Sequence, residues 1–279
     1  MKTNKIFLGI MMCSAIGLTT SCLSETKDLE PRSVPEEKET GRLVLDLNAD
    51  ANFNFETRAV DENTYRNTDN YMVNITDSKG NSKFSGTFAT LKTRLPLELD
   101  LGSYNISAEY GTEYPASRDG FKAVGSNTFT IQAAKTVETT VECTPTAGKV
   151  LVEFDSSMST YCDLYDVDFS GTAALGNNVA HWGKDDTAPF YLAISEAGET
   201  VNYTIHITTK SEYAGLNGEE KVTNATATGS FQLERNKAKK LTIMPNYTPS
   251  TEGGLKIEVT IDETTNDKPI TIEVPVTWI

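Results

Sequence analysis

Residues 41–47 read Gly-Arg-Leu-Val-Leu-Asp-Leu, and residues 148–154 read Gly-Lys-Val-Leu-Val-Glu-Phe. Both stretches open with a glycine and a basic residue, and in the first every second residue from Leu43 to Leu47 is leucine. This spacing sends alternate side chains to opposite faces of a β-strand, one buried and one solvated. The two stretches therefore predict two equivalent strands, each opening a unit of about 105 residues, which is the size of a domain.

The segments after each of these strands repeat in the same order. Each half continues with an alternating run, a glycine turn, a second alternating run, and a later pair of runs joined by a short polar turn. In the first half these runs are 95–101, 104–108, 128–131 and 137–141, and in the second half they are 190–194, 201–207, 230–233 and 241–243. No segment has a helical period of useful length. The sequence predicts an all-β chain of two tandem β-sandwich domains, 41–146 and 147–279.

Two more alternating runs, 255–261 and 270–278, lie beyond the repeat. They predict a C-terminal hairpin. An isolated hairpin with such an apolar face would tend to aggregate, so we expect it to complete a sheet of the second domain.

The N-terminus has the three zones of a secretion signal. Two lysines precede a short apolar run that ends in Leu18-Thr-Thr-Ser-Cys22, with a small residue directly before the cysteine. We expect residues 1–21 to be removed and Cys22 to carry lipid that anchors the protein in the outer membrane. An ordinary signal peptide, with Cys22 incidental, is the alternative. Residues 22–40 are polar and charged and predict a flexible tether to the cell surface.

The chain has 25 basic and 39 acidic residues, a formal net charge of −14. Such a charge repels phosphate backbones and argues against nucleic acid as a partner. Once the signal is removed and Cys22 is lipidated, Cys143 and Cys162 are the cysteines left. They flank the expected junction of the domains, where they form either one disulfide or two free thiols.

Catalytic and metal-binding patterns are missing from the sequence. The two histidines, His181 and His206, have no nucleophile in a recognisable turn, and no Cys/His spacing suits zinc. We expect a solvent-facing His206, no enzyme activity, no cofactor and no metal site. Trp182 lies in a polar loop and is either a core anchor or an exposed ligand contact.

Arg58 and Ala59 lie in a polar loop after the first strand. A protease specific for arginine could cut between them and detach the strand 43–47. The groove left behind could then accept a strand from another subunit. The alternative is an ordinary exposed loop arginine.

Several of these segments, in this order, resemble one family. They are the lipidation signal, Thr57-Arg58-Ala59, the pattern Gly-Ser-Tyr-Asn-Ile-Ser-Ala-Glu-Tyr-Gly at 102–111, and the run from Val141 to Phe154. Together they resemble the two-domain, fimbrillin-like surface lipoproteins of Bacteroidales, which are regarded as cell-adhesion proteins. The resemblance covers about Gly41 to Ile279.

The resemblance implies two immunoglobulin-like or transthyretin-like sandwiches that assemble into a pilus by strand exchange after proteolysis. It assigns Arg58 as the cut, strand 43–47 as the released strand, and the strand near 270–278 as a donor. Fimbrial subunits, host proteins or glycans would be the partners. A surface glycan-binding lipoprotein of a polysaccharide-uptake system is the alternative function, and it would need exposed aromatic rings at Trp182, Tyr161, Tyr165 or Tyr213.

Overall fold

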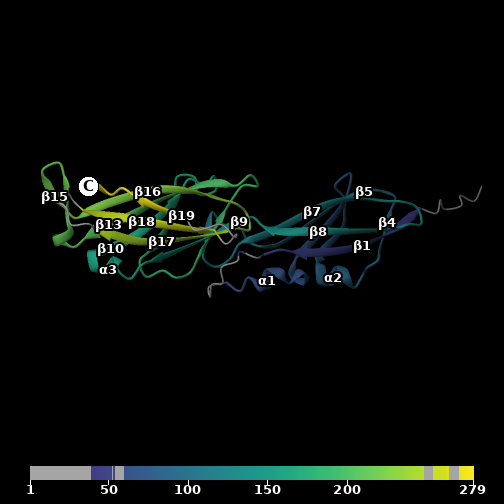
Figure 1. The fold of residues 1–279 in the computed structure, drawn as a ribbon. Coiled ribbons are helices and arrows are strands. Elements are labelled where there is room, and N and C mark those ends of the chain that lie inside the picture. The colour runs from purple at the N-terminus through teal and green to yellow at the C-terminus, as the bar shows by residue number, and fades with distance from the viewer. Residues whose placement is uncertain (1–38, 52, 54–59, 248–253, 264–269) are drawn as a thin grey trace, which may run out of the picture. The chain divides into compact units, whose positions relative to one another are not determined.

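The computed structural model describes residues 39–51, 53, 60–247, 254–263 and 270–279, and β-strands dominate them (Figure 1). The helices are single turns between strands. They are α1 (Asn63–Arg66), α2 (Phe88–Lys92) and α3 (Met158–Tyr161), with the 3-10 turns η1 (Thr68–Asn70) and η2 (Ser211–Tyr213). The prediction of an all-β chain is confirmed.

The first half of the described chain forms a sheet in the order β3-β2-β5-β7-β8-β1-β4. Its strands are β1 (Thr40–Ala49), β2 (Met72–Asp77), β3 (Ser82–Thr87), β4 (Leu97–Asp100), β5 (Gly102–Gly111), β7 (Lys122–Ile131) and β8 (Thr136–Pro145). Strands β7 and β8 pair only at Ala123↔Pro145 and Val124↔Thr144. The group β3-β2-β5-β7 and the group β8-β1-β4 are thus joined at one corner, and both send side chains into one hydrophobic cluster.

The second half forms two sheets, one of which also takes in β6 from the first half. The five-stranded sheet has the order β11-β10-β13-β16-β20, and the six-stranded sheet has the order β19-β18-β17-β9-β12-β6. The first contains β10 (Cys162–Ser170), β11 (Ala180–Gly183), β13 (Glu199–Thr209), β16 (Asn224–Leu233) and β20 (Thr277–Trp278). The second contains β6 (Ala116–Ser117), β9 (Ala147–Phe154), β12 (Phe190–Ala193), β17 (Ala238–Tyr247), β18 (Leu255–Glu263) and β19 (Ile270–Val274). A small hairpin joins β14 (Gly215–Asn217) to β15 (Glu220–Val222).

Both sheets face one hydrophobic cluster. Val167 and Ile205 enter it from the five-stranded sheet, and Val150, Leu241 and Ile257 enter it from the six-stranded sheet. The first cluster, centred on the strands before residue 146, also takes in Tyr191 and Ala238 from the second half.

The repeat in the sequence is also a repeat of hydrogen bonds. Strand β1 pairs in parallel with β8, and β9 pairs in parallel with β17. In the first half the Arg42 backbone amide donates to the Lys135 carbonyl at 2.9 Å. In the second half the Lys149 backbone amide donates to the Lys237 carbonyl at 2.8 Å. The turns before β8 and β17 also match, because Ala134 and Asn236 both have a left-handed backbone, with φ of 55° and 56°.

The C-terminal strands extend the second half as predicted, with one difference. Strand β18 pairs antiparallel with both β17 and β19, so it completes the six-stranded sheet. The predicted strand 270–278, however, is two strands. Strand β19 ends at Val274, and β20 crosses to the other sheet, where Trp278 pairs with Ala225.

The predicted strand 95–101 is shorter in the structure. Strand β4 covers only Leu97 to Asp100, and Leu101 is 41% exposed at the turn into β5.

The glycines that open the two equivalent strands have no room for a side chain. A Cβ on Gly41 would lie 2.4 Å from the Gln132 carbonyl oxygen, and one on Gly148 would lie 2.8 Å from that of Glu234. We expect Gly41→Ala and Gly148→Ala each to destabilise the fold by about 1–3 kcal/mol, because the turn must move. Guanidinium unfolding measures this as a lower midpoint.

Gly183→Ala is the matched control, since its Cβ would meet Asp186 at an ordinary contact of 3.6 Å. If Gly41→Ala and Gly148→Ala lowered the unfolding midpoint no more than Gly183→Ala, the result would contradict the claim that the turns pack too closely against these strands to admit a side chain.

Candidate functional site

Strand β1 lies between two strands of its own half, and Figure 1 draws it alongside β8. It pairs in parallel with β8 from Arg42↔Thr136 to Ala49↔Cys143. On the other side β4 covers only its first part, from Thr40↔Asp100 to Leu43↔Leu97. The seat of β1, meaning the β8 edge together with the part of β4 beside it, therefore supplies one complete ladder and one partial ladder.

One face of β1 is fully buried and the other is solvated. Leu43, Leu45 and Leu47 are 0%, 3% and 4% exposed and belong to the first hydrophobic cluster. On the outer face the Asn48 amide donates to the Glu142 carboxylate of β8 at 2.9 Å. Burying three leucine side chains contributes roughly 5–9 kcal/mol, so the leucines supply much of the affinity of this strand for its seat.

The chain leaves β1 through a segment that is only partly described. Ala51 and Phe53 are buried in the first cluster. The proposed cut between Arg58 and Ala59 lies outside the described residues, and the description resumes at Val60.

Beyond this segment a buried ion pair fixes the chain. Glu62 Oε1 accepts from Lys149 Nζ at 2.7 Å and from the Tyr191 hydroxyl at 2.7 Å. The Lys149 side chain is completely buried and also lies over the rings of Phe53 and Tyr191. We call these three residues the Glu62 clasp. It joins the loop after β1 to β9 and β12 of the second half, and nothing in the sequence spacing indicated it.

The two described cysteines are free and buried. Cys143 lies in the first cluster and Cys162 in the second. Burial raises the pKa of the Cys143 thiol to about 12 and that of Cys162 to about 11. Of the two alternatives, the structure has the free thiols, each packed into a different hydrophobic cluster.

Trp182 is a core anchor, and its exposure of 1% corrects the possibility of an exposed ligand contact. It lies on β11 with its ring edge-on to Phe190. The Arg118 guanidinium covers it, 4.7 Å from the centre of the indole ring, and pairs with Asp186 at 2.8 Å.

The tyrosines suggested for glycan binding form no flat platform. Tyr161 and Tyr213 pack against Tyr247 at the edge of the second cluster, with 65° between the planes of the first two rings. Tyr165 packs edge-on against Phe154. Stacking on a sugar needs a set of exposed, coplanar ring faces, whereas these rings are half-buried and inclined to one another.

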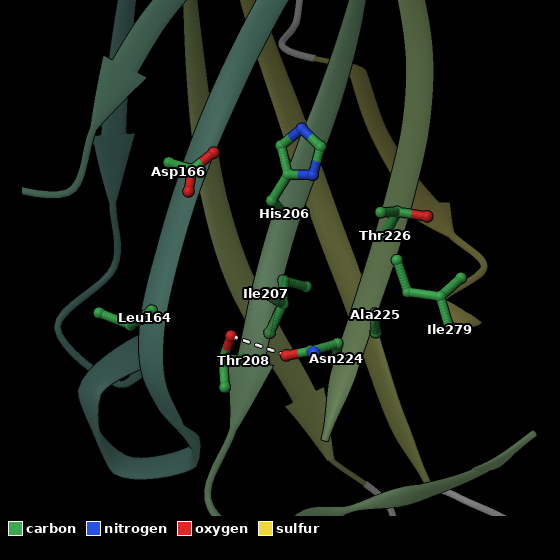
Figure 2. Close-up of a pocket in the computed structure, with 9 residues that line it drawn as sticks. All are labelled: Leu164, Asp166, His206, Ile207, Thr208, Asn224, Ala225, Thr226 and Ile279. Atoms are coloured by element: carbon green, nitrogen blue, oxygen red, sulfur yellow. Dashed lines mark hydrogen bonds between the residues drawn. The ribbon is translucent and has the colours of Figure 1, made fainter. Parts of the chain in front are cut away.

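A cluster of aspartates and histidines that sequence reasoning missed lies on the five-stranded sheet. Figure 2 shows Asp166 and His206 on neighbouring strands, lining a groove that continues to Asn224 and Ile279. His206 is on the solvent-facing side of β13, as predicted, with its side chain 43% exposed, and its Nε2 also lies 3.3 Å from Asp168 Oδ2. The spacing of Asp166 and Asp168 was the one available signal, because residues two apart share a face of a strand.

The lipidation signal ending at Cys22 lies outside the described residues, as does the tether up to Lys38. Within the described part of the chain, no helix has the length and apolar character needed to cross a membrane.

Comparison with known proteins places the chain in a family by sequence. The profile of a family described as a domain of unknown function (DUF4493) matches residues 39–276. No curated protein matches the chain.

Several solved structures are similar to this one. A fimbrial assembly protein from Parabacteroides distasonis is 14% identical, with a TM-score of 0.40, covering 84% of this chain and 98% of its own. A candidate adhesin from Bacteroides ovatus is 10% identical, with a TM-score of 0.46 and coverages of 86% and 97%. The fimbrial anchor protein Mfa2 from Porphyromonas gingivalis is 10% identical, with a TM-score of 0.35 and coverages of 80% and 97%. At these identities and TM-scores the similarities carry no functional argument.

The Glu62 clasp predicts a large effect from one substitution. Glu62→Ala removes the carboxylate from a fully buried lysine, and we expect a loss of about 3 kcal/mol in the free energy of unfolding. Glu109→Ala is the control, since Glu109 pairs with Lys122 at the surface and should cost less than about 1 kcal/mol. Equal losses in denaturant titrations would show that the clasp contributes no more than a surface pair.

Proposed function

We propose that this chain, which belongs to the family described as a domain of unknown function (DUF4493), is a fimbrillin-like structural or adhesion subunit of the cell surface. The observation that carries the proposal is the position of β1. It is the first described strand, its leucine face is buried in the first cluster, and its main partner is the β8 edge. An edge of this kind, once vacated, offers main-chain hydrogen bonds and apolar pockets to an incoming strand.

The proposed maturation step is cleavage of the Arg58–Ala59 peptide bond. It frees the segment that contains β1 and creates a new N-terminus at Ala59. The Glu62 clasp lies three residues further on and supports this step, because it would hold the new end against Lys149 and Tyr191. The strand can then leave while the loop behind it stays in place.

The incoming strand would come from another subunit. Strand β19 is the proposed donor, since it is the edge strand of the six-stranded sheet, with Ile270 60% exposed and Ile272 42% exposed. Exposed isoleucines two residues apart match the spacing of the leucines that they would replace.

The proposal includes the setting of the subunit. Until the cut after Arg58, a lipid on Cys22 would hold it in the outer membrane, with residues 22–40 as the tether and two tandem β-sandwich domains, 41–146 and 147–279, beyond it. Other fimbrial subunits, host proteins or glycans would be its partners, and it would have neither enzyme activity nor a catalytic cofactor. The glycan-uptake alternative is not favoured, because Trp182 is buried.

Mild trypsin treatment of the purified mature protein, followed by mass analysis and sizing, tests this function. We expect a selective cut after Arg58 and slow growth into ladders, while Arg42, which is paired in β1, stays intact. Arg58→Gln should abolish both the cut and the ladders. Arg94→Gln removes another exposed arginine and should change neither. Resistance at Arg58, or a cleaved protein that stays monomeric, would contradict strand exchange.

A further inference from the structure

Both histidines of the chain lie beside the same two aspartates. Asp166 and Asp168 alternate on one face of β10, Asp166 pairs with His206 of β13, and Asp168 pairs with His181 of β11. Residues directly opposite each other on paired strands point to the same side of the sheet. Strand register therefore gathers two imidazoles and two carboxylates, from three adjacent strands, on the outer face of the five-stranded sheet.

The side chains approach one another closely. His181 Nδ1 lies 2.8 Å from Asp168 Oδ1, and His206 Nε2 lies 3.3 Å from Asp168 Oδ2. One donor atom from each of Asp166, Asp168 and His206 fits within 4.8 Å of the other two. His181 Nδ1 also lies 3.9 Å from Asp166 Oδ1.

These distances suit a small tetrahedral cation. Two ligands about 2.1 Å from a zinc ion lie about 3.4 Å apart, close to the 3.3 Å between His206 Nε2 and Asp168 Oδ2. The 2.8 Å contact between His181 Nδ1 and Asp168 Oδ1 is a hydrogen bond, which a bound ion would replace. Two imidazole nitrogens with two carboxylate oxygens favour zinc-like ions, whereas calcium and magnesium prefer oxygen ligands alone.

The charge around the cluster also favours a cation. Among the described residues, the ion-pair partners of Asp166 and Asp168 are the two histidines and no lysine or arginine. Arg118 donates to the His181 carbonyl, but its charge is paired with Asp186.

We infer that Asp166, Asp168, His181 and His206 form a binding site for one divalent transition-metal ion of the zinc class. The groove in Figure 2, lined by Asp166 and His206, gives the ion a path from solvent. A bound ion would cross-link β10, β11 and β13 and so hold the edge strand β11 to the sheet. This inference does not rest on the proposed function, because the site is remote in sequence from β1 and from Arg58.

Nuclear magnetic resonance of the imidazole nitrogens in the full chain tests the site. Because the chain has two histidines, its spectrum holds two sets of imidazole signals. Substitution of either histidine shows which set belongs to which residue, and the titration itself uses the unsubstituted chain. We expect added Zn²⁺ to shift both sets and to saturate at one ion per chain, while Ca²⁺ shifts neither. Unmoved signals with Zn²⁺, or equal shifts with Ca²⁺, would overturn the site in favour of weak attraction to an acidic surface.

Calorimetric titration of variants with Zn²⁺ then identifies the ligands. Asp168→Asn should weaken binding by at least about tenfold, since loss of an outer partner alone often costs that much. Asp163→Asn is the matched control, because it removes the same charge from an exposed position on the same strand. Equal affinity of the two variants would overturn the assignment. If Asp168→Asn lowers the melting temperature, His206→Gln repeats the comparison.

Discussion

The structure depends on the parallel pairing of the opening strand of each half with a later strand of the same half, called here its closing strand. Parallel neighbours cannot be joined by a tight turn, so the chain must cross over between them. Here β2 to β7 come between β1 and β8 in the sequence, whereas in the sheet β1 and β8 are direct neighbours. The same arrangement returns in β9 and β17. In both halves the turn before the closing strand bonds to the start of the opening strand, which fixes the register.

The two opening strands differ in how firmly the chain holds them. Strand β9 continues directly from β8, lies between β17 and β12, and carries Lys149 of the Glu62 clasp. Strand β1 has the same pairing with its closing strand, and β4 covers the first part of its other edge as β12 does for β9, but β1 carries no residue of the clasp. The repeat has thus placed two equivalent strands in unequal surroundings. In the proposed function β1 is the strand that a cut after Arg58 would release, while β9 stays tied to the loop after β1 through the clasp.

Much of the fold could be predicted from the sequence because alternation reports burial directly. The leucines of β1 are buried as their spacing indicates, and so are Ile257, Val259 and Ile261 of β18. Features that depend on strand register could not be predicted. His181 and His206 meet Asp168 only because β11 and β13 flank β10 in one particular alignment. The Glu62 clasp is likewise a contact between distant segments, for which a single sequence carries no local signal. The sequence also does not show that Cys143 and Cys162 pack into different hydrophobic clusters.

The central claim is that β1 occupies a seat that recognises a strand. It is tested most directly by adding a labelled peptide of residues 40–51 to the chain cleaved after Arg58 and freed of its own β1. Fluorescence anisotropy should show saturable binding, and a peptide with Leu45→Asp should fail to bind, because position 45 is buried in the first cluster. Absence of binding, or equal binding of both peptides, would contradict the account.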